Sequence, residues 1–179
     1  MQMTRRTALN AFALTFLSAC QTTPPSMNEP KPVSRQNAEP DALGPIEAEV
    51  MAAFRGLTDA AKALDAPLYF DYIDREKFTG LSADGKAWQS SQELEKIIST
   101  GFDMVERIVS LEFPTVKVTV IQPTTAILVN EFRQTILLKD KSTVQQSGGG
   151  MQVWNKSSDK WKLVGIGASD ARQTASAVF

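Results

Sequence analysis

The sequence predicts an α+β domain in which helices come first and antiparallel strands follow. Before Pro114, apolar residues recur at spacings of three and four, as they do on one face of a helix. After Pro114 they alternate with polar residues, as in a strand with one buried face. The stretch from residue 46 to 170 is about the size of one compact domain, so we expect a single core.

Three helices are predicted in the first half of this domain. The first covers residues 46–64, and Asp65-Ala66-Pro67 ends it and starts a second over residues 68–75, because proline is tolerated in a first turn but not in a helix interior. Ser90 and Glu93 form a capping-box pattern that opens a third helix, whose apolar stripe continues until Pro114. Residues 77–88 form a loop with an Asp84-Gly85 turn, flanked by two very short strands.

Four antiparallel strands are predicted after Pro114. The first alternates Val116, Val118 and Val120 with polar residues, and a long strand follows over residues 125–138. A third strand runs to about Trp154 and a last one covers residues 161–168. The glycines at positions 148–150 interrupt the third strand, which predicts a bulge or a strong bend there.

This order of elements resembles the nuclear transport factor 2-like superfamily, which includes ketosteroid isomerase, scytalone dehydratase and SnoaL-like cyclases. The motifs that carry the resemblance are Phe78-Thr79-Gly80, Asp84-Gly85-Lys86, Trp154-Asn155-Lys156 and Trp161-Lys162-Leu163-Val164. The resemblance implies a cone in which three N-terminal helices pack on a curved antiparallel sheet. It further implies that the sheet encloses a cavity in which the enzymes of this superfamily hold their reactive groups.

Two differences from the superfamily argue against catalysis. Many members carry histidines at the positions that correspond to Gly165 and Gly167, and glycine supplies no proton carrier there. The isomerase's catalytic aspartate corresponds to the stretch 77–80, which contains no carboxylate. The resemblance therefore implies a wider binding cavity, with Gly165 and Gly167 in its wall.

Side chains elsewhere provide candidates for a pocket. Tyr69 and Tyr72 lie on the second helix together with Asp71 and Asp74, whose carboxylates would serve as the base in an isomerase-like alternative. Three side chains of the long strand share one face, and Trp88 lies beside the loop, where an indole suits a cavity mouth. The strand residues are Asn130, Phe132 and Gln134. Trp161, in phase with Leu163, is expected in the core.

The composition excludes several classes of chemistry. The chain has no histidine, and its one cysteine, Cys20, lies outside the predicted domain, so zinc sites, thiol chemistry and imidazole catalysis are not expected. No metal and no cofactor is predicted. The net charge is −1, with 19 basic and 20 acidic side chains and no long run of either sign, so no nucleic-acid partner is expected.

The N-terminus predicts export. Arg5 and Arg6 precede a short apolar stretch, too short to span a bilayer, and residues 1–19 read as a signal peptide. Leu17-Ser18-Ala19-Cys20 resembles the lipobox of bacterial lipoproteins, which implies cleavage between Ala19 and Cys20 and acylation of the cysteine. The paired arginines suit either the general secretory or the twin-arginine route.

A tether and a tail flank the predicted domain. Residues 20–45 are rich in proline and polar residues and cannot bury enough apolar surface to order themselves, so they read as a tether. Residues 171–179 read as a loose tail. Gln21 follows the lipidated cysteine, and by the sorting rule of enterobacterial lipoproteins this implies the outer membrane, with the domain facing the periplasm.

Together these patterns predict a lipid-anchored cell-envelope protein whose cone binds a small apolar or amphipathic ligand, or a protein partner, without turnover. One alternative is an isomerase, dehydratase or cyclase with an aspartate base. Another is a dimeric structural or assembly protein that associates through the outer face of its sheet, where Thr119, Glu131, Arg133 and Thr135 are expected.

Overall fold

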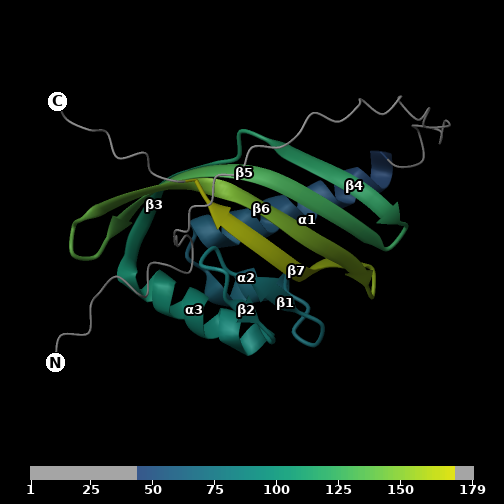
Figure 1. Cartoon of the computed structure of the whole chain (residues 1–179), viewed down its shortest axis with the longest axis horizontal. Helices are drawn as coiled ribbons and strands as arrows, with labels where there is room; N and C mark the ends of the chain where they lie inside the picture. Colours follow the sequence, from purple (N-terminus) through teal and green to yellow (C-terminus); the bar gives the residue numbers. More distant parts are fainter. Residues whose placement is uncertain (1–43, 172–179) are drawn as a thin grey trace, which may run out of the picture.

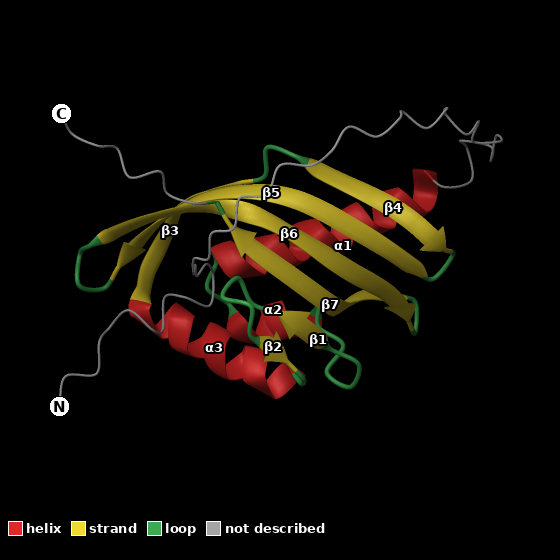
Figure 2. Cartoon of the chain, in the orientation of Figure 1, coloured by secondary structure: helices red, strands yellow, loops and turns green. Residues whose placement is uncertain are grey.

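The computed structural model describes residues 44–171, which form three helices and one curved sheet (Figure 1). The sheet arches over α1, and all three helices lie on its concave side (Figure 2). The elements in chain order are α1 (Gly44–Lys62), α2 (Ala66–Asp71), β1 (Thr79–Leu81), β2 (Ala87–Trp88), α3 (Ser91–Met104), β3 (Val105–Glu112), β4 (Val116–Gln122), β5 (Thr125–Leu138), β6 (Thr143–Ser157) and β7 (Lys160–Asp170).

The first two helices form where the sequence predicts them. Asp65 caps α2, and its side-chain Oδ1 accepts a 2.9 Å hydrogen bond from the Leu68 N–H while proline occupies the first turn. The helix is shorter than the predicted 68–75, because Ile73 forms a parallel bridge with Leu163 and draws the chain toward the sheet. Ser90 precedes α3 in an extended conformation, but its side chain makes no capping hydrogen bond, contrary to the predicted capping box.

The sheet has the order β2-β1-β7-β6-β5-β3, and β4 pairs with the first half of β5. The four long strands after Pro114 are antiparallel to their neighbours, as predicted. The sheet as a whole is mixed, however, because β1 pairs with β7 in parallel, with Thr79 opposite Gly165. The expectation of a purely antiparallel sheet is therefore corrected, since the short hairpin after α2 joins the sheet edge through a parallel pair.

The predicted third helix is too long, because residues 105–112 form strand β3. At the end of α3, Val105 already has strand dihedrals, φ −88° and ψ 133°. The strand pairs with the second half of β5 and contains two register shifts, one between Val105 and Arg107 and one between Ile108 and Ser110. Each shift adds one residue to β3 relative to β5. The apolar residues of β3 therefore fall at spacings that resemble those of a helix.

The run of three glycines lies in β6 without a bulge, which was the first of the two expected alternatives. The register with β5 is continuous across it, with Phe132 opposite Gly148 and Asn130 opposite Gly150. A Cβ atom on Gly148 would lie 2.1 Å from the carbonyl oxygen of Ser169 on β7. Glycine is therefore required at position 148 by the close approach of the neighbouring strand.

A bulge in β7 changes which residues face the helices. Leu163 lies opposite Trp154, whereas Gly165 lies opposite Val153, so Val164 is an extra residue without a partner on β6. Before the bulge, odd-numbered residues such as Leu163 point into the core. After it the alternation is shifted by one, and Ile166 faces the helices instead.

The core fills the space between α1 and the sheet. Trp154, Leu128, Leu163 and Val50 are its largest fully buried side chains, and Trp161 is also buried, as predicted. A smaller cluster of Val105, Ile136 and Leu138 packs where β3 begins and β5 ends. No helix between residues 44 and 171 is both long and apolar enough to cross a membrane.

Candidate functional site

The concave face of the sheet and the three helices border a half-open hollow of about 140 Å³, here called the conical cavity. Its helical wall is apolar, with Phe54 and Leu57 from α1 and Leu94 and Ile98 from α3. Its sheet wall is partly polar, because β5 and β6 place buried amide side chains there. These amides are Asn130, Gln134 and Gln152.

Hydrogen bonds fix the orientation of two of these amides. The Trp154 indole can only donate, and its Nε1 donates to Gln152 Oε1 at 3.0 Å. The Nε2 of Gln152 is thereby directed at Asn130 Oδ1, at 3.5 Å. Asn130 Oδ1 thus accepts from within the sheet, and its Nδ2 remains as a donor. We call Trp154, Gln152 and Asn130 the amide relay.

The sequence also contributes a phenol to the cavity wall. Tyr69 is buried and packs edge-on against Phe70 and Phe102. Burial raises the pKa of the Tyr69 hydroxyl to about 12, so the phenol is neutral near pH 7 and is able to donate a hydrogen bond. The cavity wall therefore combines apolar surface, amides and a neutral phenol.

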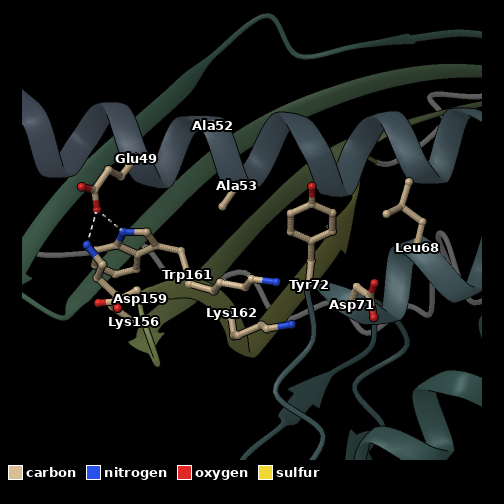
Figure 3. A pocket seen from close by; sticks show the side chains of 11 residues that line it. Glu49, Ala52, Ala53, Leu68, Asp71, Tyr72, Lys156, Asp159, Trp161 and Lys162 are labelled. Carbon is tan, nitrogen blue, oxygen red and sulfur yellow. Dashed lines mark hydrogen bonds and ion pairs between the residues drawn. The ribbon is translucent and has the colours of Figure 1, made fainter.

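The structure divides the predicted pocket residues between two hollows. Five of them line the conical cavity, namely Tyr69, Trp88, Asn130, Phe132 and Gln134. Tyr72 and Asp71 instead line an open groove of about 560 Å³ between α1, α2 and the β6–β7 hairpin. Figure 3 shows this groove, with the Tyr72 hydroxyl directed toward α1.

The groove is closed at one end by a charged contact. Glu49 Oε2 accepts hydrogen bonds from Lys156 Nζ and Trp161 Nε1, each at 2.8 Å (Figure 3). Both hydrogen bonds lower the pKa of Glu49, and the bond from Lys156 has the larger effect. Asp71 lies at the opposite end and is exposed. Asp74 lines neither hollow, and its Oδ1 accepts the N–H groups of Glu76 and Lys77 as a turn cap.

Gly165 and Gly167 line neither hollow, which corrects their predicted place in the cavity wall. The bulge at Val164 turns both to the outer face, and Ile166 and Ala168 take the inner positions. Gln152 was not predicted as a cavity residue. Its signal in the sequence is its phase, because it is a polar residue two positions before a tryptophan on an alternating strand.

Two further predictions concern parts of the molecule beyond this cavity. Ala19 and Cys20, the predicted cleavage and lipidation positions, lie outside the described residues, as do the signal peptide, nearly all of the tether and most of the tail. Within residues 44–171, no group of three acidic, histidine or cysteine side chains is placed to hold a metal ion.

Fold and sequence comparisons place the domain in a known class. Residues 50–173 match the family model described as the SnoaL-like domain, and the chain belongs to this family. No curated protein matches the chain. One similar solved structure is an NTF2-like superfamily protein from Salmonella enterica serovar Typhimurium LT2, at 14% identity and a TM-score of 0.65, covering 77% of this chain and 99% of that one.

Two other similar structures carry different descriptions. The association domain of C. elegans CaMKII has 15% identity and a TM-score of 0.60, covering 72% of this chain and 98% of its own. An uncharacterized protein with a cystatin-like fold from Caulobacter vibrioides has 11% identity and a TM-score of 0.61, covering 72% and 92%. At these identities the likeness shows the fold alone.

Proposed function

We propose that this domain binds a small, largely apolar molecule with one acceptor oxygen in its conical cavity, and does so as a lipid-anchored protein of the cell envelope. The anchor rests on the Leu17-Ser18-Ala19-Cys20 pattern. Binding without turnover is favoured by the cavity wall, whose residues supply hydrogen-bond donors and apolar contacts but no carboxylate.

The observation that carries this proposal is the amide relay in the wall of a hollow whose other lining residues are mostly apolar. A cavity of about 140 Å³ suits a molecule near the size of a substituted benzene. Because the relay directs Asn130 Oδ1 toward Gln152, the remaining Nδ2 donor suits a carbonyl or ether oxygen of a ligand. Buried polar groups of this kind provide specificity, since an analogue without the oxygen leaves the donor unpaired.

The test compares two probes of similar shape on the full chain. Acetophenone carries an acceptor oxygen and isopropylbenzene does not, and ligand-observed NMR measures both affinities. We expect acetophenone to bind about fivefold more tightly, the contribution of one hydrogen bond. Asn130→Leu should remove this preference and still bind the hydrocarbon. Gln145→Leu, at an exposed position of β6, is the matched control and should leave the preference unchanged. Failure of both probes to bind the unaltered chain would contradict the proposal.

A second candidate function is self-association through the outer face of the sheet. Val129 on β5 and Met151 on β6 lie opposite one another there and are 47% and 53% exposed, and Ile121 on β4 is 54% exposed. Adjacent large apolar side chains on a sheet face are typical of a contact surface. The contact residues that the sequence predicted on this face are polar or charged, whereas these three are apolar. We call Val129 and Met151 the outer apolar patch. Ile121 lies apart from it, four positions along β4 from Lys117, the partner of Val129.

A further inference from the structure

The wall of the conical cavity contains a second amide with an unpaired polar atom. Gln134 lies four residues beyond Asn130 on β5, lines the same cavity and is 3% exposed. Its Nε2 donates a 2.6 Å hydrogen bond to the Oε1 of Gln146, its partner on β6. This is the one side-chain hydrogen bond of Gln134 among residues 44–171, so its Oε1 is an acceptor without a partner.

The unpaired atoms of Gln134 and Asn130 are accessible from the cavity. Within the described part of the chain, Asp170 Oδ1 is the only fully enclosed side-chain oxygen or nitrogen that lacks a hydrogen-bond partner. Gln134 Oε1 and Asn130 Nδ2 have no partner either, so both atoms must retain accessible surface. Because both residues line the conical cavity and are otherwise buried, this surface borders the cavity.

The spacing of these two amides sets the length of a ligand that contacts both. Asn130, Phe132 and Gln134 share the inner face of β5, with Phe132 midway between the amides. Four residues of a strand span about 13 Å. A hydrogen bond of about 3 Å at each end leaves about 7 Å between the polar atoms of the ligand. This separation suits a carbonyl and a hydroxyl group at opposite ends of one benzene ring.

The cavity wall also restricts the charge of the ligand. Tyr69 is the only titratable residue among those that line the cavity, and its raised pKa of about 12 keeps it neutral near pH 7. A charged group in this cavity would lose hydration without gaining a counter-charge. The acceptor of Gln134 therefore suits a neutral donor, such as a hydroxyl group.

We propose that Gln134 accepts a hydrogen bond from a ligand hydroxyl group, so that the cavity selects a neutral aromatic ketone with a hydroxyl group at the opposite end of its ring. The inference rests on the proposed function, because Asn130 must bind the carbonyl oxygen. It adds a second polar contact and with it the class of ligand. An analogue without the hydroxyl group is disfavoured, because it leaves the buried acceptor unpaired.

The experiment compares 4-hydroxyacetophenone with 4-methylacetophenone on the full chain at pH 6.5. A methyl group is close to a hydroxyl group in size but donates no hydrogen bond. Ligand-observed NMR gives both affinities, and we expect the hydroxyl compound to bind about fivefold more tightly. Gln134→Leu and Gln134→Met remove the acceptor and should abolish this preference. Gln145→Leu, at an exposed position of β6, is the matched control and should keep it.

The outcomes separate this inference from the proposed function. Equal affinities in the unaltered chain, or a hydroxyl preference that survives in both Gln134 variants, would overturn the inference, while binding of 4-methylacetophenone would still support the cavity. 4-Cyanoacetophenone carries an acceptor in place of the hydroxyl donor. Its tighter binding than that of 4-hydroxyacetophenone would also overturn the inference, because Gln134 would then present its N–H groups. Binding of none of these ketones would overturn both proposals.

Discussion

Gly148 and Gly167 lie on neighbouring strands, but only one of these positions requires glycine. A Cβ atom on Gly148 would lie 2.1 Å from the backbone oxygen of Ser169, whereas a Cβ atom on Gly167 meets nothing within 4 Å. Because backbone atoms cannot rotate aside, the strands must separate to admit an alanine at position 148.

We therefore expect Gly148→Ala to lower the free energy of unfolding by about 1–3 kcal/mol, the usual cost of overpacking. Gly167→Ala should be neutral or slightly stabilising, since alanine restricts the unfolded chain. Urea unfolding followed by circular dichroism measures both. Equal effects of the two substitutions would show that the contact at position 148 has no energetic consequence.

The partly buried carboxylate of Asp170 implies a pH-dependent cost in folding stability. The folded-state pKa of about 6 lies above the ordinary 3.8, so the folded protein binds the proton more tightly than the unfolded chain. The ionised carboxylate therefore destabilises the fold above about pH 6, and this cost disappears below the ordinary pKa.

We expect Asp170→Asn to stabilise the protein at pH 7.5 by about 1 kcal/mol, a value reduced for the partial solvation of this side chain. Near pH 3.5 the same substitution should have almost no effect on stability. Thermal unfolding at the two pH values measures this difference. A variant that is less stable at pH 7.5 would show that an unobserved partner satisfies the carboxylate.

Single residues also mark the limit of prediction from sequence. The alternation along β5 placed Asn130, Phe132 and Gln134 on one face, and the structure has them in one cavity. The family resemblance placed Gly165 and Gly167 in that cavity, where they do not lie. The difference is one extra residue in β7, which no local pattern reveals because it depends on pairing with β6.

Among the elements, α1 and the β6–β7 hairpin are joined by a polar contact. Glu49 on α1 accepts from Lys156 and Trp161, which lie more than one hundred positions later in the chain. The hydrogen bonds lower the pKa of Glu49 from 4.5. The contact is therefore complete above pH 4.5 and is lost as the pH falls through the lower folded-state value.

We expect the indole N–H resonance of Trp161 to move in NMR spectra as the pH falls below 4.5, with a midpoint below that of an ordinary glutamate. Glu49→Gln should abolish this transition and leave the Trp154 indole resonance unchanged, because Trp154 donates to Gln152 instead. A Trp161 transition that persists in the variant would assign the titration to another group.

At this scale the sequence predicted nine of the ten elements and missed β3. The reason is physical, since a strand is stabilised by its partner and not by its own pattern. β3 forms because β5 extends past β4 and offers a free edge, and its two register shifts hide the alternation. The helices were simpler to predict, because their hydrogen bonds are local and Asp65 and Pro67 mark a boundary.

For the whole molecule, the outer apolar patch makes a prediction about association. Met151→Glu would place a charge in this patch and should convert a dimer into a monomer, because an unpaired charge in an interface is costly. Light scattering after size-exclusion chromatography measures the mass. Thr143→Glu, at the exposed start of β6, is the control. A monomer at every concentration of the unaltered chain would exclude this surface as a dimer contact.

The predicted lipid anchor has its own test. Cys20→Ala removes the thiol that would be acylated, so the variant should incorporate no radiolabelled palmitate and should keep its leader. The unaltered chain should be labelled and should sediment with outer membranes. An unlabelled wild-type chain would contradict the anchor and leave the cavity proposal untouched, because the two rest on different parts of the sequence.

The extra residue of β7 has one further consequence. Val164 lets one strand place Trp161 and Leu163 in the core and Ile166 and Ala168 at the cavity. Deletion of this one valine would force a choice between them, since a regular strand keeps only one phase. Either the strand's first half would leave the core, or its second half would turn Gly165 and Gly167 toward the cavity in place of Ile166 and Ala168. We therefore expect an insertion or deletion at this position to remodel the cavity wall of this domain.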